Sequence, residues 1–285
     1  MKRVAGVVGV GHTDWRDDWV RTRNGEKPTN SFGYAIRAFK RALNDAGLQR
    51  NDIDGLIAGP HTGCERMSEL LGLDPRWNDN GDAAISVIKA CMAIQSGLAS
   101  VVAIVFGYNQ RSGGVKWGGA PSGSGDNYHT EDYHAPWGLT SQGSLYALLY
   151  QSYRHKSGMT DAELGEVAVA QRHWASLNPN AIMRKRITID DYLAAPFICE
   201  PLRLFDYCIF NDGGVALIIA EAGRARKIAR KPVYIESAAR CDMNRRTTSM
   251  SPRIMDNYLP VQQDVAARLF NAASIGPEDI DLLGV

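Results

Sequence analysis

One apolar segment, at residues 79–107, constrains the fold of this chain more than any other. Its middle part, 83–97, is apolar at most positions, with Ser86, Lys89 and Gln95 as interruptions. A helix that is apolar on every side is buried in a protein core. At about 1.5 Å per residue this helix spans roughly 22 Å, too little to cross a membrane. The run at 101–106 is typical of a buried strand. The segment therefore predicts a buried helix followed by a buried strand.

A turn is expected just before this helix, at Asn80 and Gly81, because Asn-Gly is a frequent turn pair. Asp82 follows as the expected N-cap, since its carboxylate can accept hydrogen bonds from the first helical turn. A helix N-terminus carries free N–H groups and the positive end of the helix dipole, so it can hold an anion or lower the pKa of a nucleophile. The segment also fits an ordinary core helix, and the residues alone leave both interpretations open.

Composition narrows the class of protein. The chain has 285 residues, enough for one large α/β domain or two ordinary ones. Its formal net charge of +1 lacks the basic excess that a nucleic-acid-binding protein would carry. The cysteines are scattered: Cys64, Cys91, Cys199, Cys208 and Cys241. An odd, scattered set in a chain of this length predicts reduced thiols and a cytoplasmic protein.

Short strands and helices follow one another along the rest of the chain. Apolar runs predict strands at 4–10, 52–58 and 215–220. Helical periodicity predicts helices at 35–46, 65–72, 144–156, 161–175, 188–193 and 221–229. Thr160 and Glu163 form the pattern of a capping box. The charged segment up to Asn30 is expected to be a loop, and Asp212-Gly213-Gly214 a turn.

A long segment rich in Gly, Ser, Trp and Tyr lies at 107–143. Loops of this length are uncommon in compact domains and often form lids or binding loops, with a disordered or subunit-contact loop as the alternative. It contains three neighbouring polar residues for which a solvated or interface role is expected: His129, Asp132 and His134. His61-Thr62-Gly63-Cys64 has half of a metal-site spacing with no second pair nearby, so no metal site is predicted.

The end of the chain repeats its beginning. A shift of 227 residues places Asp52-Ile53-Asp54 on Asp279-Ile280-Asp281, and the strand at 4–10 on 231–237. The chain is therefore predicted to be an α/β protein of two duplicated βαβαβ halves, with the second half incomplete. We expect 1–230 to form the N-terminal half, including the long loop region at about 107–200. Residues 231–285 would start a C-terminal half that is truncated.

Three groups of segments, taken together, point to a family. They are 81–107, then 153–160 with 167–169 and 178–181, and finally 201–207 with 212–217. In order and spacing they resemble the thiolase superfamily, and within it the sterol-carrier-protein-x or lipid-transfer type. The resemblance implies paired βαβαβ halves in a layered α/β/α/β/α architecture. It also implies carbon–carbon bond chemistry on acyl-CoA thioesters, for which thiolases use a cysteine at the start of the buried helix.

The chain departs from thiolases at this nucleophile. The positions that match it, Asn80, Gly81 and Asp82, carry no cysteine. Cys91 lies about 13 Å further along the helix and is expected to be a packed core thiol. The missing cysteine resembles the steroid side-chain aldolases, which cleave a β-hydroxyacyl-CoA by a retro-aldol reaction. That reaction needs a base for the hydroxyl proton and a site for the enolate oxygen, but no thiolate.

The resemblance also suggests what the chain binds. An acyl-CoA is the implied substrate, with coenzyme A as part of the substrate and no other bound cofactor. Arg111 and Lys116 are candidates for contacts with the CoA phosphates. A homodimer or higher oligomer is implied, as is a small OB-fold and zinc-ribbon partner protein. Neither nucleic acid nor a membrane span is expected.

Three functions remain open from the sequence. The favoured one is retro-aldol cleavage of a bulky, steroid-like β-hydroxyacyl-CoA side chain. The first alternative is an ordinary acetyl-CoA acyltransferase, or thiolase, whose catalytic half lies elsewhere. The second alternative is a lipid- or acyl-CoA-binding subunit that is not catalytic by itself.

Overall fold

The computed structural model describes residues 3–59, 62–114, 135–139, 141–241 and 254–284. The chain divides into two compact units. Unit 1 comprises Met1–Gly113, Asn211–Arg240 and Val265–Val285, and unit 2 comprises Gly114–Phe210 and Cys241–Asp264. The predicted boundary between two halves at residue 230 stays a prediction.

Unit 1 is built on a mixed sheet of six strands in the order β3-β2-β4-β7-β1-β8. The strands are β1 Ala5–His12, β2 Gly55–Ala58, β3 Trp77–Asn80, β4 Val101–Asn109, β7 Asp212–Glu221 and β8 Val233–Tyr234. β2 pairs in parallel with both β3 and β4, whereas β7 runs antiparallel between β4 and β1. The predicted α/β class is confirmed. β3 was not expected, because its four residues, Trp-Asn-Asp-Asn, have the composition of a turn.

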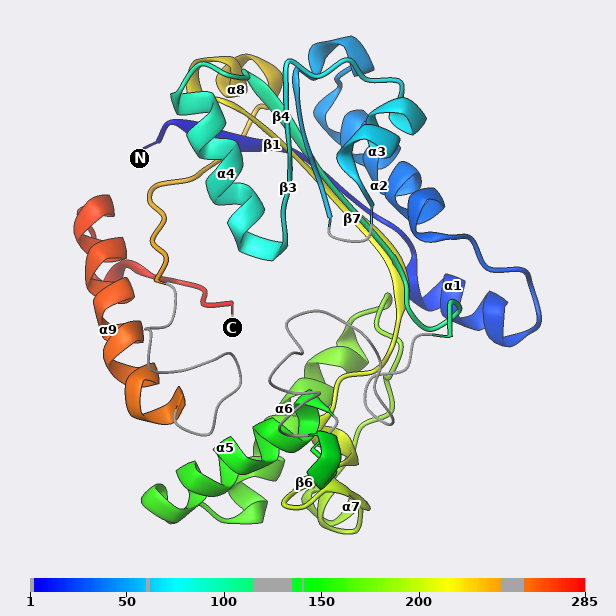
Figure 1. The fold of residues 1–285 in the computed structure, drawn as a ribbon, viewed down its shortest axis with the longest axis vertical. Coiled ribbons are helices and arrows are strands. Elements are labelled where there is room, and N and C mark those ends of the chain that lie inside the picture. The colour runs from blue at the N-terminus through cyan, green and yellow to red at the C-terminus, as the bar shows by residue number, and fades with distance from the viewer. Residues whose placement is uncertain (1–2, 60–61, 115–134, 140, 242–253, 285) are drawn as a thin grey trace. The chain divides into compact units, whose positions relative to one another are not determined.

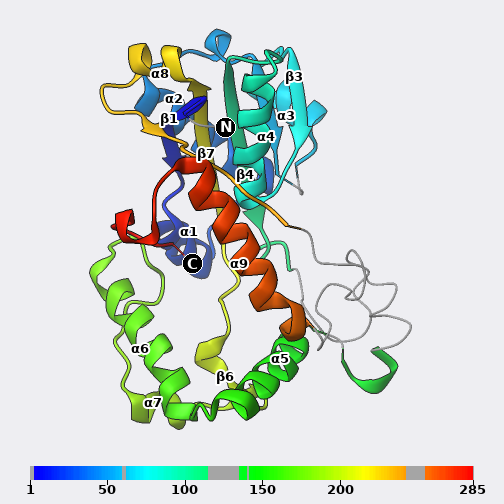
Figure 2. The same cartoon turned by 90° about the vertical axis from the view of Figure 1, so that its left-hand side faces the viewer.

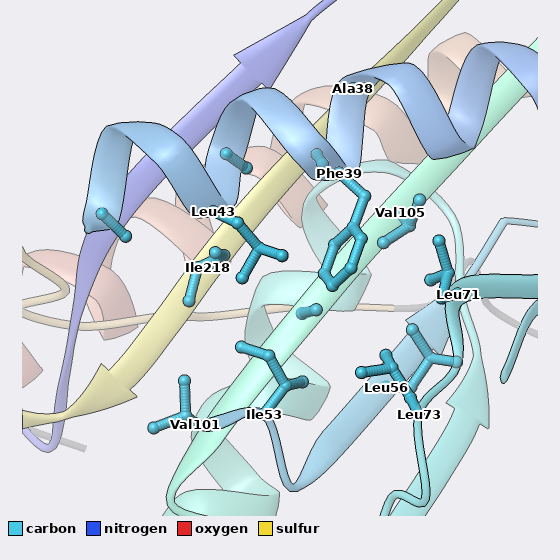
Figure 3. Close-up of a cluster of buried hydrophobic side chains, with 14 of the residues drawn as sticks. Ala38, Phe39, Leu43, Ile53, Leu56, Leu71, Leu73, Val101, Val105 and Ile218 are labelled. Carbon is cyan, nitrogen blue, oxygen red and sulfur yellow. The ribbon is translucent and has the colours of Figure 1, made fainter. Parts of the chain in front are cut away.

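Helices cover both faces of this sheet (Figure 1). α2 Ser31–Ala46, α3 Cys64–Leu71 and α8 Ala222–Ile228 contribute to the core on one face, and α4 Ala83–Gln95 packs on the other. Successive side chains of β4 point alternately to the two faces of the sheet, as strand geometry requires. Figure 3 shows the first core, where Phe39 and Leu43 of α2 point toward Leu56 of β2 and Val105 of β4.

The helix α2 ends where the sequence predicts, but its start differs. It begins one turn earlier than expected, where the Asn30 side chain accepts a hydrogen bond from the N–H of Gly33 at 2.9 Å. It ends at Gly47, which adopts the left-handed conformation with φ 65°. Gly107 lets the helix lie directly against β4, because a Cβ there would clash with the carbonyl oxygen of Ser31.

Two predictions in unit 1 are wrong. The segment before Asn30 contains a helix, α1 Trp15–Arg23, rather than only loop. Its charged sequence does not indicate a helix, because contacts with distant parts of the chain hold it in place. The buried Asp18 carboxylate, for example, pairs with Arg37 of α2 at 3.3 Å. Asp212-Gly213-Gly214 is not a turn but the first part of β7, paired with 107–109 of β4. Position 213 requires glycine in this strand, because a Cβ there would clash with the Trp15 ring.

The helix α4 is less buried than its apolar sequence predicts. Ala90, Cys91 and Ile94 are buried against the sheet, whereas Met92 on another side is 55% exposed. Within the described part of unit 1 the sheet covers only one side of α4, so its remaining apolar side chains contribute less to the core. The helix ends as predicted, with Gly97 in the left-handed conformation at φ 70°.

Unit 2 is mainly helical. Its elements are α5 Gln142–Ser157, α6 Asp161–Leu177, α7 Ile189–Leu193 and the small antiparallel pair β5 Phe197–Cys199 and β6 Leu202–Arg203. The predicted capping box at the start of α6 is confirmed: the Thr160 N–H donates to Glu163 at 2.7 Å and the Glu163 N–H donates back to Thr160 Oγ1 at 3.3 Å. α6 packs against α7 (Figure 2), where Gly165 leaves room for the buried Tyr192 ring.

The 227-residue repeat is visible in local geometry. α9 Ile254–Ala273 ends in the same way as α2, with Ser274 at φ 60° where α2 has Gly47. A 3₁₀ turn follows at Pro277–Asp279, as one does at Arg50–Asp52. The match stops there: the described residues 280–284 form no strand, and Leu283 is 76% exposed while its counterpart Leu56 is fully buried.

Among the described residues, no helix is both long enough and apolar enough to cross a membrane.

The loop expected at 107–143 lies mostly outside the described residues, which include only 107–114, 135–139 and 141–143 of it.

Candidate active site at the carboxyl end of the sheet

The candidate site lies in unit 1, where three parallel strands end. β2, β3 and β4 point in the same direction, and α4 begins three residues after β3 ends. In open α/β sheets, ligands bind outside the carboxyl ends of the strands. The structure brings the predicted slot residues Asn80, Gly81 and Asp82 to this edge, between the end of β3 and the first turn of α4.

Gly81 makes the connection from β3 to α4 compact. Its N–H donates to the carbonyl oxygen of Ala58, at the end of β2, over 3.0 Å. A Cβ on Gly81 would clash with the Ser86 hydroxyl and would lie 2.9 Å from a methyl group of Ile57. The connection therefore requires glycine, and its backbone lies against the N-terminal turn of α4.

Asp82 holds the N-cap position with an extended backbone, at φ −137° and ψ 141°. The prediction that its carboxylate caps the helix is wrong, because among the described residues it accepts no hydrogen bond from the first turn. The side chain instead points to the exposed side of the connection. The N–H groups of the first turn and the positive end of the helix dipole are thus left available at the site.

Lys89 ties the end of β3 to α4. Its ammonium group donates to the Asn80 carbonyl oxygen at 2.7 Å and forms an ion pair with the Asp79 carboxylate at 2.8 Å. The other Asp79 carboxylate oxygen accepts the Asn80 N–H at 2.8 Å. The sequence analysis treated Lys89 only as an interruption of an apolar helix. A lone lysine in an apolar helix indicates that an acceptor or carboxylate lies nearby, because a charge within an apolar environment needs a partner.

Tyr108 is a second residue that the sequence analysis missed. It lies near the end of β4 on the same sheet face as α4. Burial raises the pKa of its phenol, and the Asp82 carboxylate raises it further. Tyr108 is therefore a protonated phenol at neutral pH, and the negative charge of Asp82 acts on it.

The thiols near the site are not activated. Cys91 is completely buried in α4, and burial raises the pKa of its thiol. Cys64 at the start of α3 is buried as well; its thiol donates to the Asp79 carbonyl oxygen at 2.7 Å, and burial raises its pKa too. The prediction that Cys91 is a core thiol is confirmed.

Ser86 is also fully buried, and its hydroxyl has no hydrogen-bond partner within the described part of the chain.

Of the two predicted CoA contacts, the structure describes Arg111, which follows the end of β4. Arg111 stacks on the ring of Trp19 in α1, with its guanidinium carbon 3.5 Å from the ring centre, and donates to Thr22 at 3.0 Å. Its backbone N–H donates to the buried Asp212 carboxylate at 3.0 Å. Five other residues weighed in the sequence analysis lie outside the described residues: Lys116, His61, His129, Asp132 and His134.

Unit 2 contains a cavity of its own, with a volume of about 210 Å³. Its lining is Ala168, Gln171, Arg172, Ala175, Met183, Ile187, Phe205, Tyr207 and Ile209. The described residues of the whole chain contain no cluster of three His, Cys, Asp or Glu side chains that could hold a metal ion.

Known proteins resemble the chain over almost all of its length, although no protein-family model matches it. The chain is 32% identical, over 97% of its length and 73% of the relative, to 17-hydroxy-3-oxo-4-pregnene-20-carboxyl-CoA lyase of Mycobacterium tuberculosis. It is 29% identical, over 97% and 72%, to the steroid side-chain-cleaving aldolase of Thermomonospora curvata. It is also 27% identical, over 100% and 72%, to acetyl-CoA acetyltransferase of Methanocaldococcus jannaschii.

Solved structures agree with these relatives. The Ltp2-ChsH2(DUF35) aldolase superposes with a TM-score of 0.83 at 26% identity, over 98% of this chain and 72% of the other. A monomeric SCP2-thiolase like protein of Mycobacterium smegmatis shares the fold, with a TM-score of 0.74 at 19% identity over 100% and 60%. The fold is thiolase-like, and the named relatives show that the chain is a thiolase-like enzyme. Within that class, the chain belongs to the family of the steroid side-chain-cleaving aldolases. The predicted thiolase-like fold and enzyme class are confirmed.

Proposed function

We propose that this protein catalyses the retro-aldol cleavage of a β-hydroxyacyl-CoA with a bulky, steroid-like side chain. One observation carries the proposal. The slot at the start of α4 holds Asn80, Gly81 and Asp82 where thiolases would carry a nucleophile, while the nearest thiol of that helix, Cys91, is buried in the core. The slot can therefore serve cleavage that needs no acylated thiol. The names of the two aldolase relatives support the same reaction and the steroid-like substrate.

The reaction has two requirements that the site can meet. A base removes the proton of the β-hydroxyl group, the bond between the α and β carbons breaks, and its electron pair moves to form an enolate on the thioester. Protonation of the α carbon then releases a shorter acyl-CoA, and the β carbon leaves as a carbonyl product. The uncapped first turn of α4 would stabilise the enolate oxygen. Asp82 and Tyr108 are our candidates for the proton transfers.

CoA enters this reaction as part of the substrate, and no further cofactor is required by its chemistry. Arg111 and Lys116 remain our proposed contacts for the CoA phosphates. For Arg111 this contact competes with the stacking on Trp19, so the guanidinium must either reach a phosphate from the ring or leave it. A bidentate arginine–phosphate contact is charge-assisted and can compete with this partly buried stacking contact.

The proposal includes a partner protein. The Ltp2-ChsH2(DUF35) aldolase is, by its name, an assembly of two components, and that supports a partner protein. We propose that this partner is small, with an OB fold and a zinc ribbon. We further propose a homodimer or higher oligomer in the cytoplasm, with the cysteines reduced. Native mass spectrometry of the protein purified with and without co-expressed neighbours of its gene tests both the partner and the subunit number.

The test of the reaction uses a 17-hydroxy steroid bearing a three-carbon carboxyl-CoA side chain. Mass spectrometry of the products should detect a 17-ketone and propionyl-CoA in equal amounts, without any need for free CoA. A requirement for free CoA, together with an acyl group on a cysteine, would establish thiolase chemistry instead. Tight binding of the thioester without turnover, alone and with the partner, would favour the binding-subunit alternative.

A further inference from the structure

We propose that Lys89 is a positioning residue of the active site, which holds the backbone of Asp79 and Asn80 so that the slot at the start of α4 keeps its shape. The inference rests on the proposed function only in where that slot is assigned. Lys89 lies two turns inside α4, yet its ammonium group reaches the end of β3. Helical side chains lean toward the helix N-terminus, so a lysine at this position points at the slot.

The contacts of Lys89 fix two different parts of the β3 end. The carbonyl oxygen of Asn80 accepts a hydrogen bond from the ammonium at 2.7 Å. The Asp79 carboxylate pairs with the same ammonium at 2.8 Å through one oxygen and accepts the Asn80 N–H at 2.8 Å through the other. One cation thus restrains the peptide units on both sides of Asn80, the first residue of the slot.

Other hydrogen bonds hold the carbonyl group of Asp79 and the N–H group of Gly81, but they do not join Asn80 to α4. The Cys64 thiol donates to the Asp79 carbonyl oxygen at 2.7 Å, and the Gly81 N–H donates to Ala58 at 3.0 Å. These bonds fix the strand to β2 and α3. Among the described residues, Lys89 supplies the side-chain contact that joins Asn80 to α4 itself. Its loss would therefore let the slot move relative to the helix N-terminus.

The exposure of the Lys89–Asp79 ion pair fits a role in positioning the slot better than a role in stabilising the fold. The side chains of Lys89 and Asp79 are 35% and 39% exposed. Ion pairs exposed to this degree add little to the stability of a fold. Catalysis is more sensitive, because a displacement of about 1 Å at a reacting group can cost roughly 100-fold in rate. The variants below should therefore fold normally and still lose activity.

The test compares Lys89→Met, Lys89→Arg and Asp79→Asn in the protein as it is active, alone or with its partner. Lys89→Met should lower kcat by about 10- to 100-fold with KM within about twofold, while Lys89→Arg, which can reach both acceptors, recovers most of kcat. The double variant Lys89→Met/Asp79→Asn should lose no more than Lys89→Met, since the two residues act as one unit. Lys40→Met, at an exposed position of α2, is the matched control and should change nothing.

Two results would overturn the inference: an unchanged kcat in Lys89→Met, or a higher KM that Lys89→Arg does not rescue, which would mean direct substrate contact. Hydrogen exchange of a peptide covering 77–84 gives an independent readout, and Lys89→Met should exchange about tenfold faster there. If the wild-type protein cleaves no β-hydroxyacyl-CoA, the proposed function fails and the exchange measurement alone decides about Lys89. Unchanged exchange in that case rejects the positioning role.

Discussion

Gly81 lies directly over the hydroxyl group of Ser86, so close that the backbone of the slot and the first turns of α4 leave no room for a side chain between them. This contact joins the end of the sheet to the helix on which the site depends. It places a fully buried hydroxyl, without a hydrogen-bond partner in the described chain, beneath the slot. The close packing makes Gly81 the most sensitive position of the connection.

Gly81→Ala should therefore destabilise the protein and impair the site. The added methyl group would clash with Ser86 and press on Ile57, and overpacking of this kind costs about 1–3 kcal/mol. Urea denaturation followed by circular dichroism measures the loss. Gly63→Ala is the control, because its nearest contact would be a carboxylate oxygen at 3.8 Å. If Ser86→Ala, combined with Gly81→Ala, restores none of the stability, the clash is not the cause.

Cys91→Ala should leave the cleavage rate within about twofold of the wild type, because a retro-aldol reaction uses no thiolate. Burial raises the pKa of this thiol, which keeps it protonated and unreactive at neutral pH. In a maleimide-labelling time course, the exposed Cys208 and Cys241 should react first and Cys91 only on unfolding. A loss of activity in Cys91→Ala, or an acyl adduct on Cys91, would contradict the aldolase mechanism.

Asp212→Ala should destabilise unit 1, since the buried carboxylate of Asp212 accepts the N–H groups of both Arg111 and Ser112. Its removal leaves two backbone donors without this acceptor, at a cost of about 1–3 kcal/mol. Thermal unfolding by calorimetry measures the change against Asp74→Ala, an exposed control on the same unit. Equal melting temperatures for the two variants would show that the carboxylate does not hold this segment.

Alkaline pH should weaken the fold through Tyr34, which is 1% exposed on α2. Burial chiefly, with the charges of Asp18 and Asp212, raises its pKa from 10.0 to about 12. The unfolded chain releases this proton at a lower pH than the folded protein, so the stabilisation is complete below pH 10 and is lost as the pH rises toward 12.

The check is urea unfolding at several alkaline pH values in the wild type and in Tyr34→Phe. Over that interval the wild type should lose about 1–3 kcal/mol more than the variant, which has no proton to release at this position. Tyr146→Phe, at a 51% exposed position of α5, is the control and should follow the wild type. Parallel curves for the wild type and Tyr34→Phe would count against the buried phenol as the cause.

Several elements could be predicted because their signals lie within a few neighbouring residues. The capping box of Thr160 and Glu163, the glycine after α2 and the apolar run of β4 all depend on local backbone geometry or on burial of a continuous segment. The lack of a cysteine at Asn80, Gly81 and Asp82 was equally visible, since it is a matter of residue identity. The helix α1 and the strand β3 were missed because polar residues form them.

The sequence by itself determined the α/β elements, the glycine at the slot and the absence of a cysteine there. Only the tertiary structure decided which groups act on one another near that slot: Lys89 pairs with Asp79, and the charge of Asp82 raises the pKa of Tyr108. It also decided that β7 lies between β1 and β4, which pairs Asp212 with Asn109. The physical reason is distance along the chain. Helix caps and periodicity depend on neighbours three or four residues apart, whereas sheet order and converging side chains depend on burial shared by segments far apart in sequence.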